Sequence, residues 1–202
     1  MHEMGAEAAE KQTICEMLRN WVLWRDAGDW QRFRSLWHDD GSMVTMWFRG
    51  PVGEFIRLSR EGWHRAVNIQ PEFAGICVDV RGHRAIAQTK ITISQRGRLH
   101  NVLCDVVGTG WFYDFLEKRA GHWGIVLRHP IYEKDWIKPV NASQKVELEP
   151  EVLRRFPEAY RHLAYMHEAL GYIVKTDMPV LPGPEADTLF RRGQRWLAGD
   201  PL

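Results

Sequence analysis

The chain has 202 residues, of which 45% are hydrophobic and 26% charged, and its formal net charge at pH 7 is +1. These values are typical of one globular domain with an appendage, and without a basic excess we expect no nucleic acid partner. Three scattered cysteines outside any CxxC pair argue against a zinc site or a disulfide framework. The sequence has no apolar leader and no apolar stretch long enough to span a membrane, so we expect a cytoplasmic protein without a membrane partner.

The first third of the chain predicts three helices and one strand. Apolar residues recur at steps of three and four, which is a helical period. Gly28 ends the first helix, the second is expected to stop at 38–41, and Pro51 suits the first turn of the third. The helices are expected over 7–27, 30–37 and 51–64, with the strand over 42–48.

Beyond Pro71 the apolar pattern changes to period two, which indicates strands. Gly82, Gly97 and Gly121 predict short turns between consecutive strands, so the sheet should be an antiparallel meander. Gly108 and Gly110 interrupt the third strand and indicate a bulge or bend that curves the sheet. The four strands are expected over 76–81, 85–94, 99–117 and 122–132.

Residues 1–138 are expected to form the core domain and residues 139–202 a helical extension. The extension begins with a polar linker and should contain helices over 151–173 and 185–197, separated by an extended proline-rich segment over 178–184. Its apolar side could pack on its own sheet, close a pocket or exchange with a neighbouring subunit. We expect a homo-oligomer, either a dimer or a trimer.

Ten tryptophans are present, and their rings suit either a core or a pocket for a flat apolar ligand. We expect most of them in the core. Six fall in the first third of the chain: Trp21, Trp24, Trp30, Trp37, Trp47 and Trp63.

Three short segments carry a family resemblance. They are WRDAGDW at 24–30, HRAVN at 64–68, and WGIVLR at 123–128 followed by YEKD at 132–135. With the element order, they resemble the SnoaL-like and scytalone-dehydratase-like branch of the nuclear-transport-factor-2-like superfamily over residues 8–138. The resemblance implies an α+β fold, a cystatin-like cone of three N-terminal helices against a curved antiparallel sheet, with a cavity between them.

The resemblance implies a catalytic pair formed by Asp26 and His64. A histidine exchanges protons near neutral pH, and a carboxylate on its other ring nitrogen would fix its tautomer. Asp26 lies beside the helical stripe of Leu18 and Val22, which would turn it toward the interior. Alternatively, Asp26 helps to cap the turn between the first helices, as Asp29 could, and His64 is a solvated residue at a helix end.

The resemblance also makes Arg128, on the final strand, a candidate to stabilise an oxyanion or leaving group. The alternative is an outward ion pair, with Asp114 or Glu133 as partner. Asp105 and His100 are weaker candidates on the preceding strand, because one residue of register slip would reverse their face.

Where many relatives have a tyrosine one turn before the aspartate, this chain has Trp21. Tyr113 or Tyr132 would then have to polarise a substrate carbonyl, or the reaction differs from dehydration of the scytalone type. The expected substrate-binding residues are Trp21, Trp47, Asp105, Tyr113 and Tyr132.

We expect neither a metal nor a cofactor. The 38–40 segment is better explained as a helix stop, and His162 and His167 are spaced poorly for one helical face. Gly108 to Gly110 lacks the following helix of a dinucleotide loop.

The expected function is therefore that of a cofactor-independent lyase acting on an apolar aromatic or polycyclic molecule, by dehydration or by release of formaldehyde. Such reactions occur in the breakdown of lignin-derived diaryl compounds, and isomerisation or cyclisation by the same pair stays open. The alternative is a non-catalytic ligand-binding or assembly module with the same cone.

Overall fold

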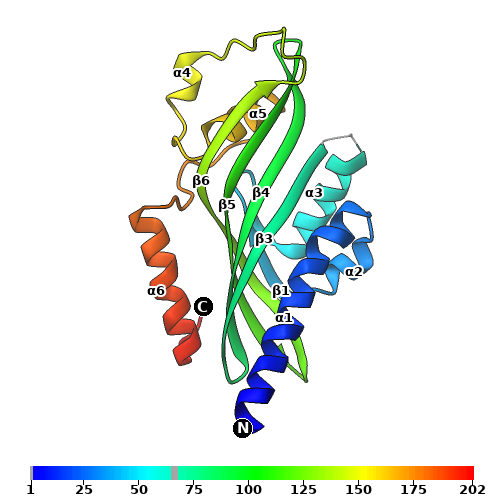
Figure 1. Cartoon of the computed structure of the whole chain (residues 1–202), viewed down its shortest axis with the longest axis vertical. Helices are drawn as coiled ribbons and strands as arrows, with labels where there is room; N and C mark the ends of the chain where they lie inside the picture. Colours follow the sequence, from blue (N-terminus) through cyan, green and yellow to red (C-terminus); the bar gives the residue numbers. More distant parts are fainter. Residues whose placement is uncertain (1, 65–67) are drawn as a thin grey trace.

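The computed structural model describes residues 2–64 and 68–202, with the side chains of residues 5–62 and 69–202. Six strands form a curved sheet in the order β2-β1-β6-β5-β4-β3. Strands β3 to β6 are the expected antiparallel meander, and β1 adds to it in parallel with β6 (Figure 1). The strands are β1 (Trp37–Val44), β2 (Arg49–Pro51), β3 (Asn68–Arg81), β4 (Arg84–Leu99), β5 (Val102–Arg119) and β6 (His122–Pro139).

Helices lie on both faces of the sheet (Figure 1). Side chains alternate between the faces along each strand. In β4, for example, Ala85 and Ala87 belong to the core under the N-terminal helices, whereas Ile86 belongs to the core under the last helix. The helices are α1 (His2–Asp26), α2 (Trp30–Arg34), α3 (Val52–His64), α4 (Pro150–Leu153), α5 (Arg161–Ala169) and α6 (Pro184–Ala198).

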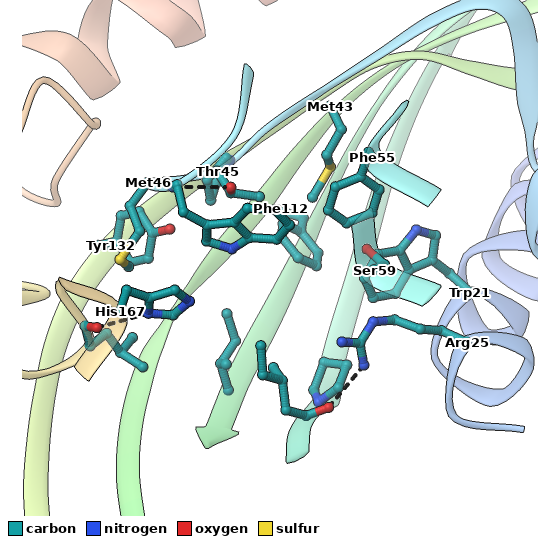
Figure 2. A pocket seen from close by; sticks show the side chains of 16 residues that line it. Trp21, Arg25, Met43, Thr45, Met46, Phe55, Ser59, Phe112, Tyr132 and His167 are labelled. Atoms are coloured by element: carbon teal, nitrogen blue, oxygen red, sulfur yellow. Dashed lines mark hydrogen bonds between the residues drawn. The ribbon is translucent and has the colours of Figure 1, made fainter. Parts of the chain in front are cut away.

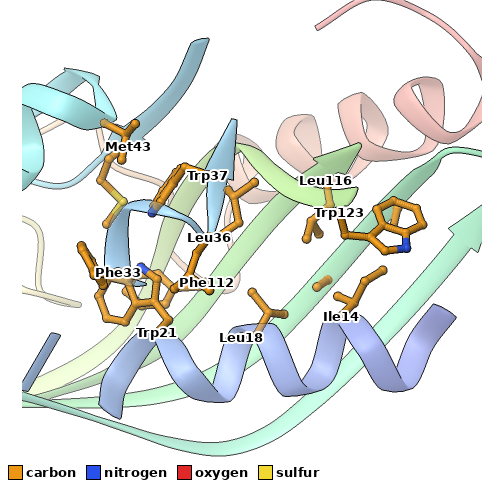
Figure 3. Packing of buried hydrophobic residues seen from close by; sticks show 14 of the residues in the cluster. Ile14, Leu18, Trp21, Phe33, Leu36, Trp37, Met43, Phe112, Leu116 and Trp123 are labelled. Atoms are coloured by element: carbon orange, nitrogen blue, oxygen red, sulfur yellow. The ribbon is translucent and has the colours of Figure 1, made fainter. Parts of the chain in front are cut away.

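Aromatic rings fill the core between α1 and the sheet. Trp21 of α1 lies 5.2 Å from Phe33 and 5.4 Å from Phe112, measured between ring centroids, and the rings meet at steep angles (Figure 3). Trp37 and Trp123 are also buried. These tryptophans therefore lie in the core, as expected. Their tilted ring contacts stabilise the fold beyond the stabilisation that comes from burying apolar surface.

Two of the three predicted turns are correct. Gly82 and Gly121 both have positive φ, at 61° and 83°, in the turns after β3 and β5. The turn expected around Gly97 is wrong, because β4 continues to Leu99 and the chain reverses at His100 and Asn101. These two residues adopt φ of 47° and 67°, a conformation that asparagine tolerates better than most residues.

The predicted bulge in β5 is confirmed. The pairing of β5 with β6 shifts register between Thr109 and Gly110. A Cβ atom on Gly110 would lie 2.2 Å from the backbone oxygen of Ile131, so only glycine fits there.

Two expected helices are shorter than predicted. The second ends at Arg34, and residues 38–41, expected as a helix stop, lie inside β1 instead. The helix expected over 151–173 is split into α4 and α5. Pro157 lies between them, and proline has no N–H to continue a helix.

Helix α6 covers the outer face of the sheet, which is the face opposite α1, whereas α5 packs against β4, β5 and β6 toward one end of the sheet. Trp196 of α6 donates its indole N–H to the Leu116 oxygen at 3.3 Å, and Arg84 lies 4.0 Å above the Trp196 ring. The first part of the segment expected to be extended, residues 178–180, is extended and pairs with Tyr132 of β6 through Pro179 and Leu181, whereas residues 181–183 bend into α6. Among the described residues, no helix is both long enough and apolar enough to span a membrane.

Candidate active-site cavity

A cavity lies between the inner face of the sheet, the C-terminal half of α1, α3 and α5. Its empty space is about 620 Å³, including the part open to solvent, and the centres of water molecules could occupy about 70 Å³ of it. A space of this size suits a small ligand. The lining residues are Trp21, Arg25, Met43, Thr45, Met46, Trp47, Phe55, Ser59, Ile69, Pro71, Ile93, Phe112, Pro130, Tyr132, Leu163 and His167.

Arg25 is the cation that faces this cavity (Figure 2). Its Nη1 donates to the Ile69 oxygen at 2.9 Å and to Asp26 Oδ1 at 3.1 Å. The first bond ties the end of α1 to the start of β3. Among the hydrogen bonds between described residues, Arg25 donates through Nη1 only.

Asp26 is less buried than its sequence position suggested. Its side chain is 40% exposed, pairs with Arg25 and is not among the residues that line the cavity. Partial burial raises the pKa of its carboxyl, and the neighbouring Arg25 guanidinium opposes that shift. The capping alternative does not apply to Asp26, because Asp29 caps α2 by accepting the N–H of Arg32 at 3.1 Å.

The side chain of His64 lies outside the described residues. The backbone of α3 ends at His64, and β3 begins at Asn68. The pairing of Asp26 with His64 thus stays a prediction.

Arg128 forms an ion pair with Asp114. The alternative explanation expected this pair on the outside of the protein, but it is buried. Its Nε and Nη2 donate to the two oxygens of Asp114 at 2.6 and 2.7 Å, and both side chains are 0% exposed. The guanidinium carbon lies 4.6 Å from the centroid of the Trp21 ring and 4.4 Å from that of Phe112. Since those two rings line the cavity and Arg128 does not, Arg128 lies behind the cavity wall.

Three of the expected substrate-binding residues line the cavity: Trp21, Trp47 and Tyr132. Trp47 is carried by a turn in which Thr45 Oγ1 accepts the N–H of Phe48 at 2.9 Å. Its ring stacks on Phe55 with centroids 5.8 Å apart.

The other two lie elsewhere. Tyr113 faces the opposite side of the sheet from its neighbour Phe112, and it packs against Phe190 of α6. Asp105 pairs with Arg96 through bonds of 2.7 and 2.8 Å. This partner lowers the pKa of Asp105, and neither residue lines the cavity.

Four polar residues of the cavity were not predicted as ligand-binding residues: Arg25, Thr45, Ser59 and His167. In the sequence, Arg25 stood out only as part of the WRDAGDW segment at 24–30, and His167 only as a candidate metal ligand. Within the described part of the chain, no group of His, Cys, Asp and Glu residues could hold a metal ion.

His167 is placed by the way α5 begins. Asp135 of β6 accepts the backbone N–H groups of His162 and Leu163, each at 2.7 Å, and thereby caps the helix. His167 follows one turn after Leu163 and donates Nδ1–H to the Leu163 oxygen at 2.8 Å. Burial lowers the pKa of His167 to about 4, so the ring is neutral at pH 7.

Two fungal proteins of Fusarium vanettenii resemble this chain along most of its length. A PEP2-like protein is 32% identical over 204 residues, which cover 96% of this chain and 88% of the relative. Pea pathogenicity protein 2 is 31% identical over 206 residues, with the same coverage.

Solved structures share the fold at low sequence identity. A protein of Novosphingobium aromaticivorans described as a candidate scytalone dehydratase has a TM-score of 0.56 at 15% identity, over 71% of this chain and 99% of its own. A hexachlorocyclohexane dehydrochlorinase has a TM-score of 0.55 at 13% identity, over 71% and 95%. The model of the SnoaL-like domain matches residues 6–129, and the chain belongs to the SnoaL-like domain family.

Proposed function

We propose that this protein is a cofactor-independent lyase that acts on a small apolar aromatic molecule. The observation that carries the proposal is the cavity itself, which is lined mainly by aromatic and aliphatic side chains and contains a few polar groups, including Arg25. Pockets of this kind bind an apolar ligand and orient it through a few polar contacts.

His64 is the proposed base, oriented by Asp26. Two features support this assignment. First, Asp26 is the last residue of α1 and His64 is the last residue of α3. Second, the hydrogen bond from Arg25 to the Ile69 oxygen holds the end of α1 against β3, the strand that follows α3. Arg25 is proposed to hold negative charge that develops on a substrate oxygen, since its Nε and Nη2 can donate to a ligand. Arg128, behind the wall, supports the position of Trp21 and Phe112 and does not touch the substrate.

Two eliminations fit one base without a cofactor. In dehydration, the base takes a proton from the carbon beside a carbonyl, the C–H electrons form a C=C bond, and the hydroxyl leaves with a proton as water. In release of formaldehyde from an aryl-1,3-propanediol, the base takes the proton of the terminal hydroxyl, and the terminal C–O bond becomes the C=O bond of formaldehyde. The bond between the terminal and central carbons breaks, and its electrons form a C=C bond between the central and benzylic carbons. The benzylic hydroxyl again leaves as water.

The test uses one substrate series for each reaction. Aryl β-hydroxy ketones report dehydration through the absorbance of the conjugated product, and aryl-1,3-propanediols report formaldehyde directly. We expect turnover by the wild-type protein, and a loss of roughly 100-fold or more in kcat/KM for His64→Ala, the usual contribution of a general base. Asp26→Asn should lower kcat with less effect on KM.

His83 provides a matched control, because its side chain is 68% exposed on the turn between β3 and β4. His83→Ala should leave turnover unchanged. Unchanged turnover in His64→Ala would eliminate the proposed base. Binding of these compounds without any turnover would favour the ligand-binding module over the lyase.

A further inference from the structure

His167 lies on α5, outside the residues that match the family model. Its side chain is 5% exposed and lines the cavity. In Figure 2 the ring points into the cavity from the side opposite Arg25 and Ser59. A residue from the extension therefore helps to form the binding site.

The hydrogen bond to Leu163 determines which ring nitrogen carries the proton. The Leu163 carbonyl can only accept, so Nδ1, at 2.8 Å from it, must be the N–H donor. In the neutral ring, Nε2 is then an acceptor with a free lone pair. Among the described residues, Nε2 has no hydrogen-bond partner.

The ring is also held in orientation by its neighbours. Trp47 stacks on it with centroids 6.4 Å apart and planes 15° from parallel, and Tyr172 lies 5.5 Å away. Because Nδ1 is bonded and two aromatic rings contact the imidazole from one side, Nε2 has a fixed direction. A fixed acceptor in an apolar cavity favours a ligand that brings a donor, because a buried polar atom left unpaired is costly.

We infer that the cavity recognises a hydroxylated aromatic ring whose hydroxyl group donates a hydrogen bond to Nε2 of His167. The aromatic lining binds the ring, and Arg25 and Ser59 on the other side can donate to an acceptor such as a carbonyl oxygen. The inference deepens the proposed function by naming its substrate class, and it rests on the same cavity. Its test measures binding and not turnover, so the two proposals can fail separately.

The probes are 4-hydroxyacetophenone and 4-methylacetophenone, which differ only in a hydroxyl group against a methyl group of similar size. Titration calorimetry with the wild-type protein should show about tenfold tighter binding of the hydroxyl compound, the scale of one hydrogen bond to a buried acceptor. The methyl compound is the more apolar one, so burial alone predicts the reverse order. 4-Aminoacetophenone, which also has a donor, should bind more tightly than the methyl compound.

Two variants assign the preference to His167. His167→Phe keeps a ring for the stack with Trp47 and removes the acceptor, so the preference for hydroxyl should disappear. His167→Gln keeps an acceptor and should retain part of it. Near-UV circular dichroism checks that both variants are folded.

A wild-type protein that binds the methyl compound as tightly as the hydroxyl compound would overturn the inference, whatever the variants do. So would an unchanged preference in a folded His167→Phe protein. A preference that depends on His167, without turnover of either substrate series, would leave the inference standing and refute the lyase.

Discussion

Replacing Asp114 by asparagine should strongly destabilise this protein, because it leaves the charge of Arg128 buried without its partner. Both side chains are 0% exposed and are joined by two bonds, at 2.6 and 2.7 Å. Breaking such a pair costs about 3–5 kcal/mol, because an unpaired charge then stays in a medium that solvates it poorly. At about 2–4 °C per kcal/mol for a chain of this length, the melting temperature should fall by roughly 6–20 °C.

The chain contains a matched control in the same sheet. Arg96 and Asp105 are also directly opposite each other on neighbouring strands and also form two bonds, but the Arg96 side chain is 51% exposed. Asp105→Asn should therefore cost less than about 1 kcal/mol. Urea unfolding at pH 7, followed by tryptophan fluorescence, measures both variants.

Replacing both buried partners by apolar residues, as in Asp114→Leu with Arg128→Met, should recover much of the loss, because no charge is then left in the core. If Asp114→Asn and Asp105→Asn cost the same within about 1 kcal/mol, burial does not control the strength of these pairs and the reasoning is wrong.

Further predictions concern His167 and two glycines. Because burial depresses the folded pKa of His167 to about 4, its neutral form contributes stability that is complete above pH 6.5 and lost as the pH falls toward 4. Wild-type stability should drop by about 3 kcal/mol more than that of His167→Gln over this interval, measured by urea unfolding at each pH, and parallel pH curves would contradict this. Gly193→Ala should loosen α6, because its Cβ would lie 1.9 Å from the Tyr113 hydroxyl oxygen, whereas Gly53→Ala in α3 meets nothing within 4 Å. Hydrogen exchange in α6 should rise in the first variant only, and adding Tyr113→Phe should partly reverse it. Gly110→Ala should lower the melting temperature by several degrees, because its Cβ would collide with the Ile131 carbonyl, and an unchanged value would argue against the bulge.

The sequence supported the fold better than it supported the site. Period-two runs predicted the strands of the meander, and Gly82 and Gly121 correctly marked two of its turns, because those turns need residues that tolerate positive φ. Gly97 misled the prediction because it lies within β4, where a Cβ would come 2.8 Å from the Met166 sulfur. A glycine required for close packing looks like a turn glycine in a single sequence.

The site was harder to predict because it joins residues far apart in the chain. Asp105 and Tyr113 looked suitable by residue type, but which face of the sheet each occupies depends on the register, and one lies in a surface ion pair while the other lies under α6. His167 reaches the cavity because Asp135 positions the start of α5. No periodicity in the sequence reports that contact.

The position of the extension has a consequence for how the chain folds as it is synthesised. Helix α5 forms one wall of the cavity, and α6 covers the outer face of the sheet; both helices are made after the sheet and the N-terminal helices. While the ribosome still holds them, the cone has two bare apolar surfaces, and such surfaces favour aggregation. A stop codon placed just before α6 would thus leave the residues of the cavity in place and expose Tyr113, Phe115 and Ile131 permanently.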